Sequence, residues 1–491
     1  MKVLIVVSEA PPIVSGVSRC VDRIVRGLES EGATVDVLSS NDVRRWTFGE
    51  ARISSFLGHW PSVRRSLGQY DVVNLHGPAP TMSDAFLALY PSRRSARRPA
   101  LVYTHHSSID IDGLGPLCRA YDSMTARLAS RADRVIVTTP SYAEMVGRAG
   151  SPPIDVIPWG VDAPIVARRE RVPSNGPLRL LFVGQHRPYK GVSLLINAVA
   201  GRPELRLTIA GTGPLEQEHR RQAAATGTDN ITFTGRISDE ALSQIYLEHD
   251  VIVLPSTTRA EAFGLVLLEG MAAGCVPVAS DLPGVRDVAG GTGVLVAPGD
   301  GAALQDALLS LAGDRGRVER LSHASRHAAH SQPWEMTSRA YMVAFEDAIH
   351  DAEAARWSEE LRRTIRPPEQ RLPALARQFD ASWWSLVLFD GKGQGRPMAR
   401  WGRVASHEFR QTPSELAAYV ARSGEPLLLH RDRGPRELRP MLTRPDILSS
   451  MAVPIEQRWT RGVLSLTSAG GDDRRAYTKR DLNALVMAVA R

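Results

Sequence analysis

Two glutamates in one short stretch could hold a ligand that carries both hydroxyl and phosphate groups. Glu261 follows the polar loop 256–260, and Glu269 comes eight residues later, inside a helix that we expect to begin near Phe263 or Gly264. The free N–H groups at the start of a helix attract anions, whereas a carboxylate accepts hydrogen bonds from hydroxyls. A buried carboxylate needs such a donor. A helix cap plus one solvated glutamate is the alternative on spacing alone.

A second stretch places cations directly before a helix. Arg187 and Lys190 lie in a loop bounded by Gly184 and Gly191, and a helix is expected over 192–199. Two cations and the N-terminus of a helix together can neutralise a diphosphate. A solvated basic turn is the alternative.

Histidines follow two of the expected strands. His76 comes after the apolar run 72–75, and His105 and His106 come after the run 101–103. Ligands bind at the carboxyl ends of parallel strands in α/β proteins, so these histidines are candidate contacts. A polar cap on the strand is the simpler interpretation.

Two other patterns could suggest a metal ion. Asp110 and Asp112 form a D-x-D pair, and His323, His327 and His330 fall on one face of a helix. The D-x-D pattern is common by chance, and no acidic residue or cysteine accompanies the histidines. We therefore expect no metal site.

Short apolar runs alternate with helical segments over residues 1–350. The runs occupy 3–7, 35–38, 72–75, 101–103, 135–137, 178–183, 207–210, 231–233, 251–254, 276–279 and 294–296. This alternation predicts an α/β fold with parallel sheets covered by helices on both faces. A chain of 491 residues is long enough for several domains. The first loop contains Ser15-Gly16 instead of G-x-G-x-x-G, which disfavours a dinucleotide cofactor; Gly16 could still let a phosphate approach the helix.

Composition restricts the possible partners and compartment. The net charge of +7 fits anionic substrates or lipid headgroups and does not by itself indicate nucleic acid. The basic segment 431–444 lacks interleaved aromatic residues, so we expect no nucleic-acid partner. Cys20, Cys118 and Cys275 are far apart and form no C-x-x-C pair, which indicates a reducing compartment.

Hydropathy predicts no membrane span, because no apolar run reaches about 18 residues. We expect a cytoplasmic protein. Arg93, Arg94, Arg97 and Arg98 could rest on anionic lipid at the inner face of a membrane. A solvated surface is the alternative.

The stretch VIVLPSTTRAEAFGLVLLEGMAAGCVPVAS, residues 251–280, resembles the E-x7-E segment of retaining glycosyltransferases of the GT-B fold, family four, the glycosyl transferases group 1. The usual form is PS-x-x-E-G-F-G-x-x-x-x-E-A-M-A-x-G-x-P-V. Ala262 and Gly270 stand where the family has Gly and Ala, both changes between small residues.

Other segments resemble the same family. Gly184 to Gly191 is similar to G-R-x-x-x-x-K-G, with Gln185 at the arginine position and Arg187 as its possible substitute. Gly211 and Gly213 fit the I-x-G-x-G-P turn. The strand and loop ending at Gly235-Arg236 are similar to those beside the nucleotide base, and residues 154–162 resemble a V-I-P-N-G-V-D ending in which Trp159 replaces the Asn. Ser15 replaces the first of two glycines.

The resemblance implies two Rossmann-like domains that face a cleft. Residues 1–165 would bind the acceptor, 176–333 the nucleotide sugar, and a helix over 334–350 would cross back before a linker over 351–370. The donor is expected to be a nucleoside-diphosphate sugar, and the acceptor a hydroxyl of a glycan, a lipid-linked molecule or a small molecule.

The resemblance also assigns roles to residues. Glu261 would hold hydroxyls of the donor sugar, Glu269 the ribose, and His106 the sugar, with His105 as the fallback. Arg187, Lys190 and the amides of Phe263, Gly264 and Leu265 would stabilise the diphosphate. The family needs neither a metal nor another cofactor, and the leaving phosphate serves as the base.

Residues 371–491 resemble a GAF domain, a six-stranded antiparallel α+β module that binds a small ligand or pairs subunits. The resemblance lies in Ser449 to Ile455, Arg461 to Thr467 and Tyr477 to Leu482. A dimer through this domain is one expectation, and a structural appendage without a ligand is the alternative.

Two other functions compete with sugar transfer. One is a GT-B epimerase, or a phosphorylase that carries pyridoxal phosphate on a lysine. The other is a sensory or scaffolding protein with a degenerate transferase half, against which the intact Glu261 and Glu269 argue.

Overall fold

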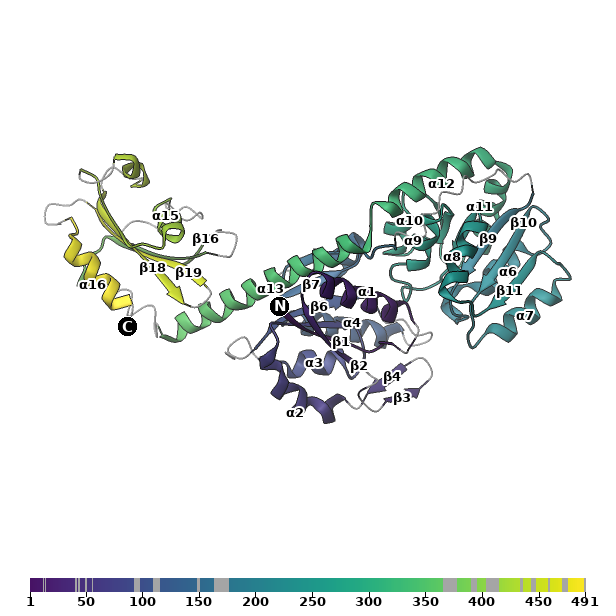
Figure 1. Ribbon diagram of the computed structural model, residues 1–491, viewed down its shortest axis with the longest axis horizontal. Helices are drawn as coiled ribbons and strands as arrows, with labels where there is room; N and C mark the ends of the chain where they lie inside the picture. The colour runs from purple at the N-terminus through teal and green to yellow at the C-terminus, as the bar shows by residue number, and fades with distance from the viewer. Residues whose placement is uncertain are drawn as a thin grey trace. The chain divides into compact units, whose positions relative to one another are not determined.

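The computed structural model describes residues 1–11, 13, 15–39, 42, 45–48, 51–54, 56–91, 98–108, 115–147, 151–162, 176–364, 378–389, 395–402, 415–432, 436–442, 447–457, 460–469 and 476–489. The chain divides into two compact units. The larger comprises Met1–Tyr90 and Leu101–Phe345, and the smaller comprises Pro91–Ala100 and Glu346–Arg491. Figure 1 shows the secondary structure along the chain.

The first half of the larger unit is built around a six-stranded sheet in the order β2-β1-β5-β6-β7-β8. Its strands are β1 (Lys2–Val7), β2 (Thr34–Ser39), β5 (Val72–Gly77), β6 (Ala100–His105), β7 (Arg134–Val137) and β8 (Ile154–Val156). β1 runs parallel to β2 and β5, and β7 runs parallel to β6 and β8. The helices are α1 (Gly16–Ser30), α2 (Phe56–Ser66), α3 (Ser83–Leu89), α4 (Gly115–Ala129) and α5 (Pro140–Val146), and β3 (Arg45–Phe48) pairs with β4 (Ala51–Ser54) in a separate hairpin.

The second half repeats this architecture in the order β11-β10-β9-β12-β13-β14, with every pair parallel. Its strands are β9 (Leu178–Val183), β10 (Leu205–Ala210), β11 (Ile231–Gly235), β12 (Val251–Leu254), β13 (Val276–Ser280) and β14 (Val294–Val296). The helices are α6 (Val192–Val199), α7 (Glu216–Ala225), α8 (Asp239–Glu248), α9 (Leu265–Ala272), α10 (Val285–Ala289), α11 (Gly301–Gly313) and α12 (Arg315–His330). The apolar runs form strands in both halves, as predicted. The runs in the inner strands are almost wholly buried because helices cover both faces of a parallel sheet, whereas those in the edge strands β2, β11 and β14 are partly exposed.

The two halves are joined by two chain segments that hydrogen-bond to each other. Val161 pairs with Pro333 as an isolated parallel bridge. The N–H of Val161 donates to the carbonyl of Gln332 at 2.9 Å, and the N–H of Trp334 donates back to Val161 at 3.4 Å. A Cβ at Gly160 would lie 2.5 Å from the nitrogen of Trp334, so only glycine allows this close approach.

The helix after this junction, α13 (Trp334–Thr364), begins where predicted and ends well beyond residue 350. Its start contacts the first half: the Thr337 hydroxyl donates to Pro158 at 2.9 Å, and Arg339 pairs with Glu31 at 3.2 Å. The predicted linker over 351–370 is therefore helical up to residue 364. Residues 351–364 are rich in Ala, Glu and Arg and contain neither Gly nor Pro, which favours continuation of the helix.

The smaller unit contains an antiparallel sheet in the order β16-β15-β19-β18-β17. Its strands are β15 (Trp383–Phe389), β16 (Gly395–Gly402), β17 (Leu427–His430), β18 (Ile447–Gln457) and β19 (Thr460–Ala469). The described residues thus give five strands where six were expected. Helix α15 (Glu415–Ser423) contributes Leu416 and Val420 to one apolar cluster of the sheet, and α16 (Lys479–Val489) contributes Leu485 to another.

Several predictions concern residues outside the described ones. Asp110, Asp112, Arg93, Arg94 and Arg97 are among them. Arg98 does not belong to a surface patch. It is 1% exposed, and its Nε donates to the carbonyl of Pro91 at 3.1 Å, because a buried guanidinium needs acceptors.

Within the described part of the chain, no helix combines the length and the apolar character needed to cross a bilayer.

Candidate functional site

The loops after β9 and β12 lie next to each other because these two strands are neighbours at the centre of the second sheet. The chain order reverses between them, which is where open α/β sheets bind ligands. The N–H of Thr257 donates to the carbonyl of Tyr189 at 2.8 Å. Gly191 has φ +68°, and a Cβ there would lie 2.0 Å from the carbonyl oxygen of Pro255. Only glycine therefore lets the loop over 184–191 pack so closely on the loop after β12.

Lys190 and Glu261 meet between these loops. The Lys190 Nζ lies 2.5 Å from the Glu261 Oε2, to which the Ser256 hydroxyl also donates at 3.1 Å. Both charged side chains are largely buried. Burial alone would lower the pKa of Lys190, but the neighbouring Glu261 carboxylate outweighs it and the net shift is upward. The pair therefore places a permanent cation and an acceptor-only anion at the centre of the candidate site.

Arg187 lies three residues before Lys190 and is half-buried. Its Nε donates to the Gln185 Oε1 at 2.8 Å. Gln185, which occupies the position of the family's arginine, thus accepts a hydrogen bond from the guanidinium of Arg187. This contact fits the prediction that Arg187 substitutes for that arginine, but it does not test it.

A glycine turn after β10 packs against the same loop. Gly211 has φ +133°, and a Cβ there would lie 2.0 Å from the carbonyl oxygen of Gly184. A Cβ at Gly213 would lie 2.6 Å from the nitrogen of His186. The predicted glycines Gly184, Gly211 and Gly213 are therefore brought together, because the two backbones touch.

Helix α9 begins beside Glu261. Gly264 precedes it with φ +76°, and no side chain caps its first turn. Phe263 and Gly264 are buried, and Leu265 is half-buried. The predicted helix start near residues 263–264 is correct to within one or two residues, and its amides lie at the end of the loop that carries Glu261.

Glu269 lies further along α9, and it has the hydrogen-bond donor that burial demands. The Tyr246 hydroxyl donates to its Oε2 at 2.7 Å, and Arg19 Nη1 lies 3.9 Å from its Oε1. Burial raises the pKa of Glu269, partly offset by the Tyr246 hydrogen bond and by Arg19. Arg19 also pairs with Asp239. Arg19 was not among the residues predicted for the site; the sequence signal that could have found it is its position in the helix that follows the Gly16 loop.

Arg236 and Gly16 lie apart from the Lys190–Glu261 pair. Arg236 is exposed and lines a shallow hollow together with Arg19 and Asp239. Gly16 is exposed, and a Cβ there would meet nothing within 4 Å. Ser15 caps the helix instead, accepting from the N–H of Ser18 at 3.1 Å.

The first half contributes aromatic and imidazole groups. His106 is buried, with its ring 5.0 Å from that of His76 and 5.6 Å from that of Trp159. Trp159 in turn lies 5.1 Å from Phe263, directly before α9. His106 and the loop of Glu261 and Phe263 are thus linked through Trp159, the residue that departs from the family's asparagine.

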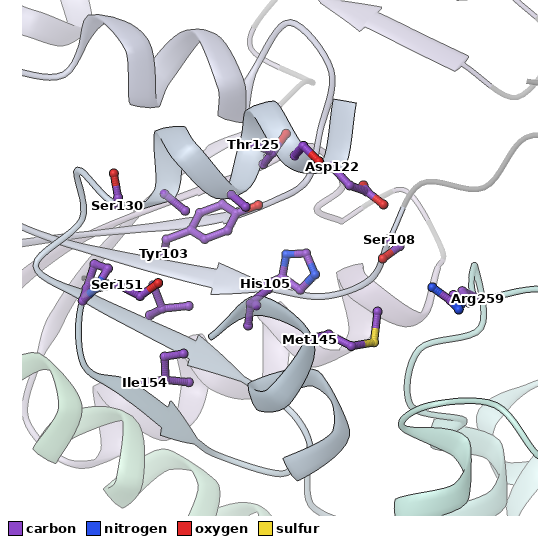
Figure 2. A pocket seen from close by; sticks show the side chains of 16 residues that line it. Tyr103, His105, Ser108, Asp122, Thr125, Ser130, Met145, Ser151, Ile154 and Arg259 are labelled. Carbon is purple, nitrogen blue, oxygen red and sulfur yellow. The ribbon is translucent and has the colours of Figure 1, made fainter. Parts of the chain in front are cut away.

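His105, the fallback candidate, lies elsewhere. It projects into a pocket between β6 and α4, which Arg259 reaches from a loop of the second half (Figure 2). Burial lowers the pKa of His105 to about 4, so its ring is neutral at physiological pH. The remaining lining combines the Asp122 carboxylate and hydroxyl groups with apolar side chains, among them Tyr103, Ser108 and Met145.

In the described residues, no three or more His, Cys, Asp and Glu side chains are arranged to hold a metal ion. The set His323, His327 and His330 on α12 is therefore not a candidate centre.

Family models match three segments of the chain. They are Glycosyltransferase Family 4 at residues 14–163, Glycosyl transferases group 1 at residues 166–328, and GAF domain at residues 371–491. Together they cover both halves of the larger unit and the antiparallel sheet of the smaller one.

Two curated relatives are similar in sequence. The D-rhamnosyltransferase WbpZ of Pseudomonas aeruginosa is 33% identical over 256 residues, which are 50% of this chain and 65% of that protein. The phosphatidyl-myo-inositol mannosyltransferase of Mycobacterium leprae is 30% identical over 333 residues, which are 65% of this chain and 83% of that protein. The chain thus spans less than two thirds of the length of the first relative.

A solved structure shares the fold. The Anabaena protein HepE in complex with UDP and glucose matches with a TM-score of 0.54 and 20% identity, over 70% of this chain and 99% of that one. The two Rossmann-like halves therefore form a GT-B fold.

Proposed function

The chain belongs to the glycosyl transferases group 1 family and carries a C-terminal GAF domain, and we propose that it transfers a sugar from a nucleoside-diphosphate sugar to an acceptor hydroxyl with retention of configuration. The observation that carries this proposal is the buried Lys190–Glu261 pair at the carboxyl ends of β9 and β12. Support also comes from the relatives, which are named for mannosyl and rhamnosyl transfer, and from HepE, which holds UDP and glucose.

The cations act on the leaving group. Negative charge develops on the departing diphosphate, and Lys190, Arg187 and the first amides of α9 would stabilise it. The ion pair with Glu261 keeps the buried Lys190 neutralised until a phosphate replaces the carboxylate as its partner.

The carboxylates act on hydroxyl groups. Glu261 would accept hydrogen bonds from the donor sugar while its anomeric carbon becomes oxocarbenium-like. Glu269 would accept from the ribose, because Tyr246 occupies only one of its oxygens. We assign no protein general base; the leaving phosphate takes the proton of the acceptor hydroxyl, and no metal is required.

The pocket beside His105 would receive the acceptor. Arg259 lines it and lies two residues before Glu261, so a molecule in this pocket lies close to the loop that holds the donor sugar. Its hydroxyl groups, the Asp122 carboxylate and the Arg259 guanidinium can accept from and donate to hydroxyls, and apolar side chains lie beside them, so the lining suits a hydroxyl-bearing acceptor.

A thermal-shift screen with nucleoside diphosphates and their sugars tests the proposal. A ligand that binds the folded state raises the melting temperature, and the ligand that does so is then assayed as a donor with a panel of acceptors. Glu261→Gln and Lys190→Gln should lower kcat by about 10²- to 10³-fold, whereas Glu204→Gln, at an exposed position of the same half, should leave it unchanged. If no nucleotide raises the melting temperature and no donor is consumed, the proposal fails.

A further inference from the structure

The loop that carries Glu261 has little regular structure to hold it. Residues 255–264 connect β12 to α9 and belong to neither a strand nor a helix. Within the loop, the N–H of Glu261 donates to the Thr258 carbonyl at 3.2 Å, and the N–H of Ala260 donates to the Thr258 Oγ1 at 3.3 Å. These local bonds shape the turn, but the position of a loop in the molecule depends on the scaffold that packs against it.

Tyr142 contacts this loop before and after Glu261. It lies on α5 of the first half and is fully buried. Its hydroxyl donates to the carbonyl of Arg259 at 3.4 Å, and Ala262 packs against the apolar cluster of the first half to which Tyr142 belongs. Burial raises the pKa of Tyr142 and the nearby Glu261 carboxylate adds to this shift, so the hydroxyl keeps the proton that it donates.

Gly284 closes the same contact from the second half. It precedes α10 with φ +83°. A Cβ at Gly284 would lie 1.8 Å from the carbonyl oxygen of Ala262 and 2.9 Å from the Cε2 of Tyr142. The residue after Glu261, the glycine and the tyrosine ring therefore meet with no room for a methyl group, which leaves this side of the loop little freedom to move.

Helix α5 is itself fixed to the second half beside this contact. The N–H and the hydroxyl of Ser141 donate to the two carboxylate oxygens of Asp287, each at 2.9 Å. Asp287 lies on α10, three residues after Gly284. Thr139 caps α5 by accepting from the N–H of Tyr142 at 3.4 Å. The first turn of α5 thus sets the direction in which Tyr142 meets the loop.

We propose that Tyr142 is a positioning residue for the sugar transfer: it fixes the loop on both sides of Glu261, and Ser141 with Asp287 aligns α5 for this contact. The inference rests on the proposed function, in which Glu261 holds hydroxyls of the donor sugar. A misplacement of about 1 Å at a reacting centre can cost about 100-fold in rate. The first half thus sets the position of a carboxylate that belongs to the second half.

Steady-state kinetics of Tyr142 variants test this role. Tyr142→Leu should lower kcat by about 10- to 100-fold at saturating donor and acceptor. Its affinity for the nucleoside diphosphate, measured by calorimetry, should stay within twofold of the parent chain (an order-of-magnitude bound), because Lys190 and Arg187 are untouched. Tyr142→Phe keeps the ring between the loop and Gly284, so it should restore kcat to within about threefold of the parent chain.

Tyr90→Leu is the matched control for the loss of a buried tyrosine. Tyr90 belongs to the same apolar cluster and is 2% exposed, but it stacks on Phe86 at a ring distance of 5.5 Å and not on the loop. Both leucine variants should lower the melting temperature, since each removes a ring from the core. Only Tyr142→Leu should lower kcat. Equal kcat values in the two variants would overturn the positioning role.

Asp287→Ala gives the same test without disturbing the core. Asp287 is exposed, so the variant should fold even if Tyr142→Leu does not. It removes both acceptors of Ser141 and loosens α5, which should lower kcat roughly two- to fivefold with unchanged affinity for the nucleoside diphosphate. Asp287→Asn retains one carbonyl acceptor and should fall between Asp287→Ala and the parent chain. An unchanged kcat in Asp287→Ala would contradict the alignment of α5.

The outcomes separate this role from the proposed function. If the parent chain consumes no sugar nucleotide, the proposed function fails, and the positioning role fails with it. If the parent chain is active but Tyr142→Leu behaves like Tyr90→Leu, only the positioning role fails. If Tyr142→Phe loses as much kcat as Tyr142→Leu, the hydroxyl takes part in the reaction itself and the ring does not act by placing the loop.

Discussion

The two halves of the larger unit share one architecture and present opposite chemistry. The second half brings charges to its strand ends, with Lys190 against Glu261, and Arg19 of the first half reaches its Glu269. The first half brings neutral groups, since burial lowers the pKa of His76, His105 and His106. The same fold therefore presents a buried ion pair at the strand ends of one half and neutral imidazoles at those of the other. Each prediction below tests this difference between the charged strand ends of the second half and the neutral strand ends of the first.

The largest effect is expected from Glu261→Gln. The substitution keeps the shape and a hydrogen-bond acceptor but removes the charge that offsets the buried Lys190. We expect kcat to fall by about 10²- to 10³-fold, measured with the best donor. A fall of less than about threefold would show that the second half does not work through this charge.

The next effect concerns the backbone that brings the charges together. Gly191→Ala should lower the free energy of unfolding by about 2–4 kcal/mol, because the new Cβ would lie 2.0 Å from the Pro255 oxygen. Gly227→Ala is the matched control: its φ of +67° is nearly the same as the +68° of Gly191, but nothing lies within 4 Å. Gly227→Ala should lower the free energy of unfolding by only about 1 kcal/mol. If chemical denaturation gave the same loss of unfolding free energy for both variants, the close approach of the two loops would be unimportant for stability.

Glu269→Gln should have a smaller effect, confined to donor binding. The amide still accepts from Tyr246 but no longer attracts Arg19. We expect the donor KM to rise roughly tenfold, equivalent to about 1.4 kcal/mol, with kcat nearly unchanged. A fall in kcat with constant KM would place Glu269 in the chemical step instead.

The smallest effect is a dependence of stability on pH that originates in the first half. His105 has a folded-state pKa of about 4 and His106 of about 3, both below the unfolded value of about 6.5. Below pH ~6.5 the unfolded chain binds more protons, so stability falls as the pH drops towards these folded values. The upward pKa shift of Glu269 acts in the opposite direction and lowers stability as the pH rises.

Urea unfolding at pH 6.5 and 5.5 measures this dependence. Each buried histidine should contribute up to ~1.4 kcal/mol per pH unit, and His105→Gln should remove one such contribution. His323→Gln, at an exposed position, should leave the dependence unchanged. The neutral character of the first half would be disproved if His105→Gln showed the same loss as the parent chain.

Much of the second half could be predicted from the sequence. Its motifs are local: Lys190 and its loop glycines are neighbours in the chain, and Glu261 and Glu269 share one loop and helix. Local patterns set turns and helix starts, so the strands, the start of α9 and the hydrogen-bond donor required at Glu269 followed from spacing alone.

The first half could be predicted only in outline. Its strands were visible, but the hydrogen bonds that link Asn74, His76 and His106 join residues from different strands, and Trp159 comes from beyond the sheet. Arg19 likewise gains its partners only across the two halves. Contacts that tertiary packing creates between residues far apart in the chain leave no pattern of spacing in the sequence. The greater length of α13 could not be predicted for another reason: the segment over 351–364 is charged and polar, as linkers are, although its residues favour a helix.

The bridge between Val161 and Pro333 has a mechanical consequence. Because both connections between the halves are bonded to each other at one point, a change of the angle between the halves must pivot there. Trp159 is two residues from this pivot and would move little. The contacts of Arg19 with Asp239 and Glu269 also join the two halves, and they would be the first to break when the angle between the halves changes. The two halves can thus separate at the Arg19 contacts while the contacts of Trp159 with His106 and Phe263 stay in place.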